Sequence, residues 1–551
     1  MLKGCTPWPV EFARRYRDAG YWEGLSLWGM LERSIGRWPD KTALVHGPRR
    51  VTYAELGAAA TALAIQLLKQ GLRPLDRAVV QLPNGIEFVV AFFALVRIGV
   101  IPVLALPAHR KVEIEHFVAH SGALAYLVAD HVRDFDYRPM ATEIAAVRPA
   151  LRHVMVLGEP GPGQASLSAL LRVAAPRDAA PLLAPHAPES DEVAVMLLSG
   201  GTTGLSKLIP RTHDDYVYNA RQSATVSGFG PQTVFLAVLP LGHNYGLASP
   251  GILGAFYHGG TAVIAESAAP EAIFPLIERE RVTAVAAAVP LLVNWLNSGE
   301  SARYDMGSLK VLINGGARLA PELRRRAEAQ LGCVYQENYG TGEGLLCITR
   351  LDDGDAERLN SSGEPVSPGD EIRVVDDADR EVPDGEPGQL ICRGPYTVRG
   401  YYNNPEATRA AYTADGFYRM GDAVRKIGRH VYFEGRLKDL VNRGGEKISC
   451  EEVENHILAH QGVRGVCVVA MPDAVYGEKA CAFVLPQPGT TLTFNELSAF
   501  LAARGIAKFK FPERLEIVAE FPISPAGKIL RRELRRMIGE KIAAERAALP
   551  G

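Results

Sequence analysis

A glycine- and hydroxyl-rich run, Ser199-Gly-Gly-Thr-Thr-Gly-Leu-Ser-Lys207, has the composition of a phosphate-binding loop and directly follows the apolar segment Val193–Leu198. Its backbone N–H groups and hydroxyl side chains can surround phosphate oxygens, and its terminal lysine adds a positive charge. It is not the P-loop pattern, which places Gly directly before Lys, and a plain surface loop is the structural alternative. The residues predicted to contact phosphate are Ser199, Gly200, Gly201, Thr202, Thr203, Gly204 and Lys207.

Four further motifs follow along the chain, and all five occur in the order that is typical of one family. They are Tyr339-Gly-Thr-Gly-Glu343, Gly416-Phe-Tyr-Arg-Met-Gly-Asp422, Gly435-Arg436-Leu-Lys438-Asp with Arg443-Gly-Gly-Glu-Lys447, and Pro522-Ile-Ser-Pro-Ala-Gly-Lys528. Together the motifs resemble the signatures of the adenylate-forming superfamily, which includes acyl-CoA synthetases, luciferases and peptide-synthetase adenylation domains. The resemblance spans most of the chain and implies ATP-dependent activation of a carboxylic acid.

The resemblance implies ATP and Mg²⁺ as cofactors and assigns residues to them. Glu343 would hold Mg²⁺, because this hard cation is usually bound by one or two carboxylates together with phosphate. Asp422 would accept hydrogen bonds from both ribose hydroxyls, and Arg436 would reach ribose or phosphate. The adenine ring would lie against Tyr339 and Gly340, with Gly315, Gly316 and Ala317 beneath it. A salt-bridged glutamate, turn residues and a core tyrosine are the structural alternatives.

Attack of a carboxylate on the α-phosphorus brings anions together, so positioned cations and donors lower the barrier. By resemblance, Lys528 would bridge the carboxylate and the α-phosphate; an exposed lysine in a glycine turn is the alternative. Lys438 would be the hinge about which a C-terminal domain rotates for the second half-reaction. The thiolation loop would comprise Arg443, Gly444, Gly445 and Lys447.

The run Leu239–Pro250 follows a predicted strand and contains His243-Asn244-Tyr245 and Ser249. Polar groups and an aromatic wall at a strand end suit the mouth of an α/β crevice. The run resembles the aryl-acid activating enzymes of siderophore assembly, as do Pro210–Asp215 and Arg393–Tyr402. By that resemblance Asn244 would bind an ortho hydroxyl, Tyr245 would line the ring, Ser249 would face the next ring position, Leu346 would form a pocket wall and His243 would assist catalysis.

Serine at position 249 favours 2,3-dihydroxybenzoate, because relatives with cysteine there tend to take salicylate. A site that pairs a substrate hydroxyl rejects the analogue that lacks it. Several residues depart from the subgroup pattern and leave salicylate, 3-hydroxypicolinate and aminobenzoate open: Ser206, Gly246, Thr341, Gly342, Leu346 and Met420. His243 is equally well explained as a structural histidine.

The acyl acceptor implied by the resemblance is a phosphopantetheinylated aryl carrier protein, with coenzyme A as the alternative. An aryl-CoA ligase and a non-catalytic ligand-binding protein on the same scaffold are the rival functions. A helix near the C-terminus could meet an acidic carrier, although interspersed glutamates favour a solvated face. Its basic residues are Arg531, Arg532, Arg535, Arg536 and Lys541.

Composition excludes several other classes of protein. Sixty basic and 62 acidic residues give a formal net charge of -2, so no overall field attracts nucleic acid or an anionic membrane. Seven scattered cysteines form no C-x-x-C pair. Phe88–Leu106 is interrupted by Arg97, Gly99 and Pro102 and is predicted to be a buried helix and strand. With no evident signal peptide, a cytoplasmic protein is expected.

The predicted fold class is α/β: a large N-terminal domain of two α/β subdomains plus a small β-barrel-like subdomain, followed by a small mobile α+β C-terminal domain. Alternating apolar runs and helical patterns predict parallel β-α-β units. The expected boundaries are an adenylation core at 1–435, with subdomains at about 1–190, 191–360 and 361–435, and a lid domain at 436–551. Glu159–Asp191 is predicted to be a surface loop, with an interdomain linker as the alternative.

Overall fold

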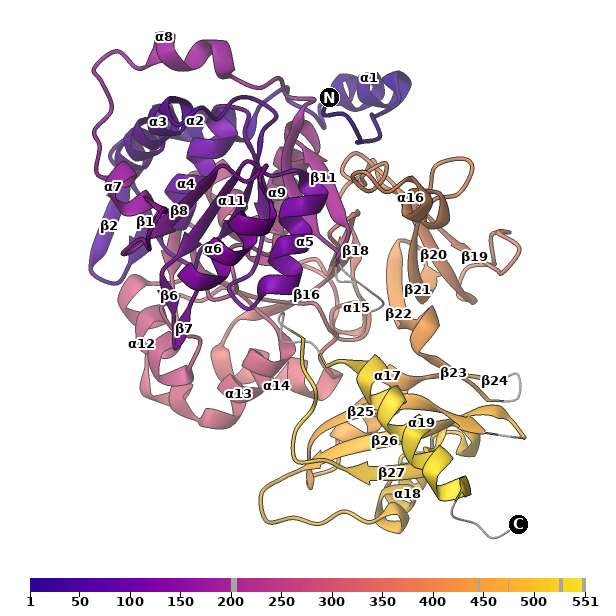
Figure 1. Cartoon of the computed structure of the whole chain (residues 1–551). Helices are drawn as coiled ribbons and strands as arrows, with labels where there is room; N and C mark the ends of the chain where they lie inside the picture. The colour runs from indigo at the N-terminus through magenta and orange to yellow at the C-terminus, as the bar shows by residue number, and fades with distance from the viewer. Residues whose placement is uncertain (200–205, 444–445, 474, 525–528, 548–551) are drawn as a thin grey trace. The chain divides into compact units, whose positions relative to one another are not determined.

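The computed structural model describes residues 1–199, 206–443, 446–473, 475–524 and 529–547 (Figure 1). The side chains at 438, 442, 446, 447, 546 and 547 also lie outside the described set. The chain forms two compact units. The first comprises Met1–Ile372, Cys392–Tyr418 and Arg429–Val431, and the second comprises Arg373–Ile391, Arg419–Gly428 and Tyr432–Gly551.

A seven-stranded sheet in the first unit carries the predicted phosphate loop. Its order is β11 (Leu208–Thr212), β10 (Val193–Leu198), β4 (Ile101–Leu104), β3 (Arg77–Gln81), β5 (Ala125–Ala129), β8 (His153–Leu157) and β9 (Ala165–Ser166). All neighbours are parallel except β10 and β11, which are antiparallel. Strands β4 and β5 are buried along their whole length, as expected for a parallel sheet covered on both faces.

A nine-stranded sheet in the same unit carries the other predicted site residues. Its order is β18 (Glu364–Pro365), β17 (Gly344–Ile348), β16 (Val334–Thr341), β15 (Val311–Gly315), β14 (Ala284–Ala287), β12 (Val234–Ala237), β13 (Thr261–Ile264), β1 (Thr42–His46) and β2 (Arg49–Thr52). The strands from β16 to β1 are parallel, and the edge pairs are antiparallel.

Helices cover the sheets in layers. They are α1 (Val10–Asp18), α2 (Leu27–Arg37), α3 (Tyr53–Lys69), α4 (Ile86–Arg97), α5 (Lys111–Ser121), α6 (Arg138–Val147), α7 (Leu167–Leu171), α8 (Ala180–Leu183), α9 (His213–Val226), α10 (Asn244–Ala248), α11 (Gly251–Tyr257), α12 (Pro270–Glu280), α13 (Val289–Ser298), α14 (Pro321–Leu331), α15 (Asp355–Asn360) and α16 (Pro405–Ala411). Short elements complete the unit: β6 (His131–Val132), β7 (Phe135–Asp136), η1 (Ala184–His186) and η2 (Glu300–Arg303).

The core lies between the two sheets. Residues of α2, α3, α4, α9 and α11 pack there with side chains from both sheets, and α4 is buried on nearly every side. A helix that is apolar all round belongs in such an interior, so the prediction of a buried helix and strand at Phe88–Leu106 is confirmed. The outer face of the seven-stranded sheet is covered by α5 and α6, and that of the nine-stranded sheet by α12, α13 and α14.

The second unit holds a four-stranded and a five-stranded sheet. The first has the order β19 (Glu371–Val375), β20 (Pro387–Arg393), β21 (Tyr418–Ile427) and β22 (His430–Arg436), and most of its residues belong to this unit. The second pairs β24 (Glu446–Ser449), β23 (Leu440–Arg443), β26 (Gly477–Pro486) and β25 (Val463–Asp473), with β27 (Arg514–Ile517) on β26. Its helices are η3 (Leu437–Asp439), α17 (Cys450–Leu458), α18 (Phe494–Ala503), η4 (Lys508–Lys510) and α19 (Arg531–Ala547).

Side-chain caps start helices α3 and α17. Thr52 and Glu55 form a complete capping box at α3, and Ser449 Oγ accepts a hydrogen bond from Glu452 N at α17. The division predicted near residue 190 does not coincide with the sheets, because β1 and β2 join the nine-stranded sheet while β10 and β11 join the seven-stranded one. The domain boundaries themselves stay a prediction. Within the described chain, every helix is too short or too polar to cross a bilayer.

Candidate active site

The two ends of the phosphate loop are locked together by paired hydrogen bonds. Ser199 N donates to Lys207 O, and Lys207 N donates to Ser199 Oγ, both at 2.9 Å. The backbone bond continues the antiparallel ladder of β10 and β11 by one residue pair. The remaining predicted phosphate contacts, Gly200, Gly201, Thr202, Thr203 and Gly204, lie outside the described residues.

Lys207, Tyr401 and Glu343 meet beside this loop. Nζ of Lys207 lies 4.3 Å from the centre of the Tyr401 ring, and the Tyr401 hydroxyl donates to Oε1 of Glu343 at 2.9 Å. The first contact is a cation–π interaction and the second a charge-assisted hydrogen bond. Burial, together with the nearby Glu343 carboxylate, raises the pKa of Tyr401, which keeps its hydroxyl a donor. Tyr401 therefore contacts the Lys207 ammonium with its ring and the Glu343 carboxylate with its hydroxyl.

The turn that carries Glu343 is also fixed through its backbone. Val398 N donates to Glu343 O at 2.7 Å, and Arg211 Nη1 donates to Gly342 O at 3.0 Å. Arg211 is fully buried and forms an ion pair with Asp215 at 2.6 Å. Since Arg211 lies in β11, the strand that leaves the phosphate loop is tied directly to the Glu343 turn.

The donor set suits magnesium held jointly with phosphate. Among the described residues, no three His, Cys, Asp or Glu side chains converge on one point. Glu343 is largely buried and would supply one carboxylate, leaving the other coordination positions to phosphate oxygens and water. That is the usual arrangement for Mg²⁺ in nucleotide-dependent enzymes.

The predicted adenine-binding residues lie side by side at one end of the nine-stranded sheet. Gly315 ends β15 and pairs in register with Asn338, directly before Tyr339 in β16. Tyr339 is half-buried, and Gly316 and Ala317 are exposed. A Cβ on Gly315 would lie 2.8 Å from Cζ of Tyr245, so only glycine fits there. The floor predicted for adenine therefore contacts the wall predicted for the aryl ring.

The predicted aryl-acid residues cluster at α10. His243 is exposed and caps this helix, with Nδ1 accepting from Tyr245 N at 3.2 Å. The Tyr245 hydroxyl donates to Ile313 O at 2.9 Å, which fixes its ring. Asn244 donates from Nδ2 to Oγ of Ser249 at 3.1 Å. The predicted substrate contacts Asn244, Tyr245 and Ser249 thus come together, and their roles stay predictions.

Leu346 occupies a more enclosed place than a simple pocket wall. It pairs with Gly340 across β16 and β17 and packs in a buried cluster with Tyr218 and Tyr396. Its N–H donates to the Tyr396 hydroxyl at 3.0 Å, which in turn donates to Oδ2 of Asp370 at 2.6 Å. Burial raises the pKa of Asp370 to about 7.

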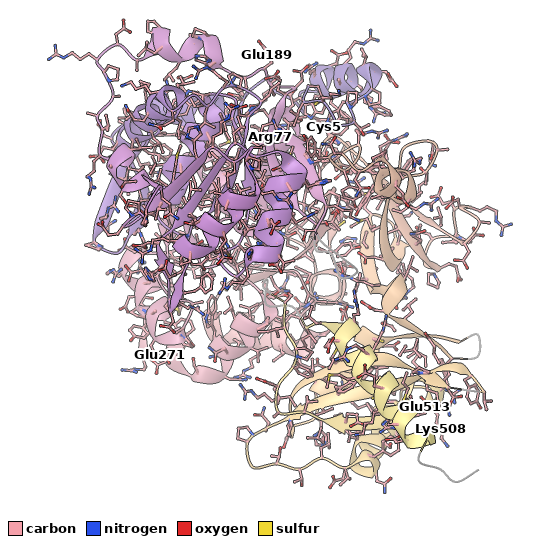
Figure 2. All side chains as sticks on the ribbon, in the orientation of Figure 1. Cys5, Arg77, Glu189, Glu271, Lys508 and Glu513 are labelled. Atoms are coloured by element: carbon pink, nitrogen blue, oxygen red, sulfur yellow. The ribbon has the colours of Figure 1, made fainter. Side chains whose placement is uncertain are left out.

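Two predicted nucleotide contacts meet in the second unit. Oδ1 of the buried Asp422 lies 4.0 Å from Nε of Arg436. Glu513, which is labelled in Figure 2, accepts a hydrogen bond from Arg443 of the predicted thiolation loop at 2.6 Å. The Arg443 guanidinium lies 4.0 Å from the Tyr476 ring centre. Lys528, Gly444, Gly445 and the side chains of Lys438 and Lys447 lie outside the described set.

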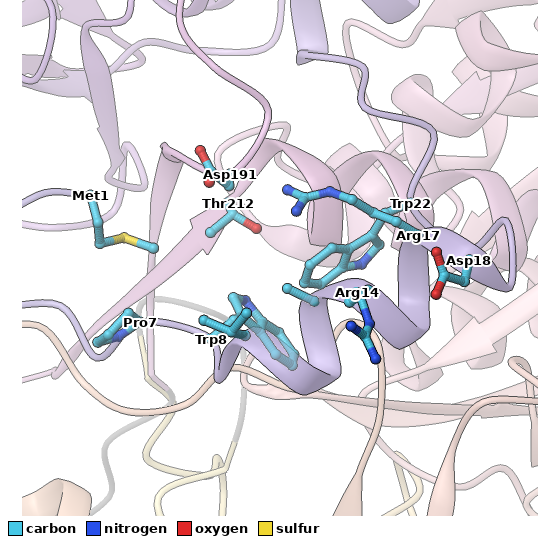
Figure 3. Close-up of a pocket in the computed structure, with 11 residues that line it drawn as sticks. Met1, Pro7, Trp8, Arg14, Arg17, Asp18, Trp22, Asp191 and Thr212 are labelled. Atoms are coloured by element: carbon cyan, nitrogen blue, oxygen red, sulfur yellow. The ribbon is translucent and has the colours of Figure 1, made fainter.

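A cavity of about 360 Å³ opens beside α1 (Figure 3). Trp8, Trp22, Arg14 and Arg17 contribute to its lining, and none of the predicted site residues does. Arg17 forms an ion pair with Asp214 at 3.0 Å, which joins α1 to α9. The motif residues of the first unit, and not this cavity, define the candidate site in that unit.

Sequence reasoning missed three residues that organise the site: Tyr401, Arg211 and Tyr216. Tyr401 and Arg211 fall in the runs Arg393–Tyr402 and Pro210–Asp215, which were recognised as family-like without roles being assigned. Tyr216 lies just beyond the second run, and its hydroxyl donates to Asn244 Oδ1 at 2.9 Å. Their functions depend on contacts between distant segments, which spacing along the chain does not reveal.

The comparisons with known proteins match this geometry. Residues 31–402 match the AMP-binding enzyme model, and residues 452–528 match the AMP-binding enzyme C-terminal domain. The chain therefore belongs to the AMP-binding enzyme family. The predicted superfamily, the mixed α/β fold with a small C-terminal domain and the assignment as an enzyme are confirmed.

Relatives of known activity cover almost the whole chain. It is 46% identical over 545 residues to the 2,3-dihydroxybenzoate-AMP ligase of Bacillus subtilis (strain 168), covering 99% of both proteins. It is 42% identical to the salicyl-AMP ligase / salicyl-S-ArCP synthetase of Mycobacterium tuberculosis (strain ATCC 25618 / H37Rv), over 98% of this chain and 95% of that one. The anthranilate CoA ligase AuaEII in complex with anthranoyl-AMP has a TM-score of 0.84 at 25% identity, covering 95% and 98% of the chains.

Proposed function

We propose that this protein uses ATP and Mg²⁺ to convert an aryl acid, best matched by 2,3-dihydroxybenzoate, into its acyl-adenylate. It then transfers the acyl group to the phosphopantetheine thiol of an aryl carrier protein. The observation that carries the proposal is the contact between Gly315 and Tyr245, which sets the predicted nucleotide floor against the predicted aryl wall. The names of the two relatives at 46% and 42% identity support the same chemistry.

The first half-reaction forms the mixed anhydride. A carboxylate oxygen of the acid attacks the α-phosphorus, the bond to the bridging oxygen of the β-phosphate breaks, and pyrophosphate leaves. Lys207 and Lys528 would stabilise the developing charge, and Glu343, oriented by Tyr401, would be the residue that holds Mg²⁺. Magnesium supplies charge neutralisation when bound, as in other nucleotide-dependent transfers.

The second half-reaction releases AMP. A thiolate sulfur, having lost its proton, attacks the carbonyl carbon, and the bond to the adenylate oxygen breaks. Rotation about Lys438 exchanges Lys528 for the loop at Arg443–Lys447, so that one crevice serves both steps. Because Arg443 is paired with Glu513, this movement has to break or carry along that ion pair.

Pyrophosphate exchange across hydroxylated and aza-substituted benzoates tests the proposal. We expect exchange with 2,3-dihydroxybenzoate to be fastest and Ser249→Cys to shift the preference toward salicylate, because a thiol is a weak hydrogen-bond donor. Failure of every aromatic acid to support exchange would leave only a non-catalytic binding role. Equal thioester yield with free coenzyme A and with carrier protein would favour the aryl-CoA ligase alternative, which the likeness to the anthranilate CoA ligase supports.

The contacts of α19 weaken the idea of a basic carrier-binding face. Of the five basic residues considered in the sequence analysis, four form ion pairs within the same unit: Arg531 with Glu454 at 2.6 Å, Arg535 with Asp439 at 3.1 Å, Arg536 with Glu540 at 2.6 Å and Lys541 with Glu516 at 2.8 Å. Arg532 is exposed. A solvated face therefore remains the better interpretation, and unchanged carrier loading at low salt after charge reversal at Arg532 and Arg535 would confirm it.

A further inference from the structure

Tyr216 is a buried tyrosine of α9 that touches the predicted aryl-acid residues. Its side chain is fully buried, and its hydroxyl donates to Oδ1 of Asn244 at 2.9 Å. Among the described residues, Asn244 offers the acceptor within hydrogen-bond reach of this hydroxyl. The contact therefore decides which way the Asn244 amide points.

The opposite orientation of Asn244 is disfavoured by the same contact. Turning the amide would place Nδ2 against the Tyr216 hydroxyl and leave the buried tyrosine proton without an acceptor, which is costly. With Oδ1 on Tyr216, Nδ2 faces Ser249 and donates to its Oγ at 3.1 Å. Tyr216 thus acts on Ser249 through Asn244.

Ser249 receives a second amide donor from α9. Nδ2 of Asn219 lies 3.4 Å from Ser249 Oγ and 2.6 Å from Ala248 O, and the carbonyl can only accept, so the Asn219 amide is oriented as well. A serine hydroxyl has one proton and two acceptor lone pairs. Two amide groups occupy the acceptor side of Ser249, and its own proton is left to donate.

We propose that Tyr216 is a specificity-determining positioning residue, which keeps Ser249 a hydrogen-bond donor and selects aryl acids that carry an acceptor at the ring position facing Ser249. The inference rests on the proposed function, in which Ser249 contacts the ring. A phenolic hydroxyl accepts from Ser249, whereas an aromatic amino group is mainly a donor because its lone pair is delocalised into the ring. The pocket therefore favours hydroxyl over amino at this position.

The test compares 2,3-dihydroxybenzoate with 3-amino-2-hydroxybenzoate by their kcat/KM values in acid-dependent pyrophosphate exchange. We expect the wild type to favour the dihydroxy acid by about tenfold or more, the effect of one well-made buried hydrogen bond. Tyr216→Phe lets Asn244 turn, so this ratio falls toward one. Tyr218→Phe is the matched control, because it removes another buried hydroxyl of α9 whose partner is Ser367 at 2.6 Å. The control leaves the ratio unchanged.

The outcomes separate this inference from the proposed function. If none of the aryl acids supports pyrophosphate exchange, the proposed function is wrong. Exchange by the wild type with the same ratio in Tyr216→Phe and Tyr218→Phe would overturn the inference alone. If Tyr216→Phe does not fold, Asn244→Asp is the second variant. Its carboxylate keeps one acceptor oxygen for Tyr216 and presents the other to Ser249. The Ser249 hydroxyl then donates to this carboxylate and not to the substrate, so the ratio must fall. A retained ratio in that variant overturns the inference.

Discussion

The hydroxyl of Tyr401 donates a hydrogen bond to Oε1 of Glu343 at 2.9 Å across 58 residues of sequence. Tyr401→Phe removes this bond and keeps the aromatic ring beneath Lys207. We expect the Mg²⁺ concentration for half-maximal pyrophosphate exchange to rise about tenfold, since groups that orient a metal ligand typically contribute 10- to 100-fold to affinity. A magnesium titration of the exchange rate measures this shift.

The neighbouring Tyr402→Phe is the control for that titration. Tyr402 is buried in the core on the outer face of the seven-stranded sheet, where its ring contacts His120. Its replacement should leave the magnesium requirement unchanged. An identical shift in both variants would mean that loss of a buried hydroxyl, and not the orientation of Glu343, is responsible.

Lys528→Ala should lower adenylation by at least about a hundredfold, because one key charge-stabilising group is lost. Transfer from pre-made acyl-adenylate should survive, since the proposed mechanism places the movement of the C-terminal domain before that step. Single-turnover assays of the two half-reactions measure the difference, with Lys508→Ala, at an exposed position, as the control. Equal loss in both half-reactions would contradict the separate role of this lysine.

Gly315→Ala should weaken the use of both substrates, the aryl acid and ATP. The added Cβ would lie 2.8 Å from Cζ of Tyr245, whose hydroxyl is anchored on Ile313 O, so the ring has to move. Displacement of a positioning group by about an ångström can cost on the order of 100-fold in rate. Steady-state kinetics should show higher KM values for both the acid and ATP, whereas Gly36→Ala, with open space around its Cβ, should leave them unaltered. A higher KM for only one of the two substrates would contradict a shared wall between the predicted adenine and aryl-acid sites.

Asp370→Asn should change how stability depends on pH. Burial raises the pKa of Asp370 from 3.8 to about 7, so between these values the unfolded chain ionises while the folded protein keeps the proton. The wild type therefore loses stability relative to the variant as pH rises through this window, by at most about 1.4 kcal/mol per pH unit. Denaturant melts of both proteins across the window, with the exposed Asp352→Asn as a control, measure this slope. A constant difference would contradict it.

Local signals in the sequence predicted the elements well, since they depend on neighbouring residues alone. The apolar run at Val193–Leu198 needs only a few adjacent positions, and the structure forms strand β10 there. The motif turns were found for the same reason. Their joint presence also predicted the enzyme family, which the comparisons confirm.

Contacts between distant segments could not be predicted from one sequence. Tyr401 lies in the family-like run Arg393–Tyr402, and its contact with Lys207, 194 positions earlier in the chain, is visible only in the structure. Arg211 and Tyr216 were hidden for a similar reason, because a buried arginine and a buried tyrosine are ordinary core residues until their partners are known. Sheet membership was likewise hidden, since the pairing of β1 with β13 joins segments that no local pattern relates.

The interleaving of the two large sheets has a consequence for biosynthesis. The nine-stranded sheet joins β1, near the start of the chain, to β13 and continues to β18. The seven-stranded sheet is incomplete until β10 and β11 have been synthesised. Neither sheet can be completed from an early portion of the nascent polypeptide. β1 lacks its parallel partner until β13, at Thr261–Ile264, has left the ribosome, and the nine-stranded sheet is completed only by β18, at Glu364–Pro365. Until then the unpaired strand edges need protection from aggregation.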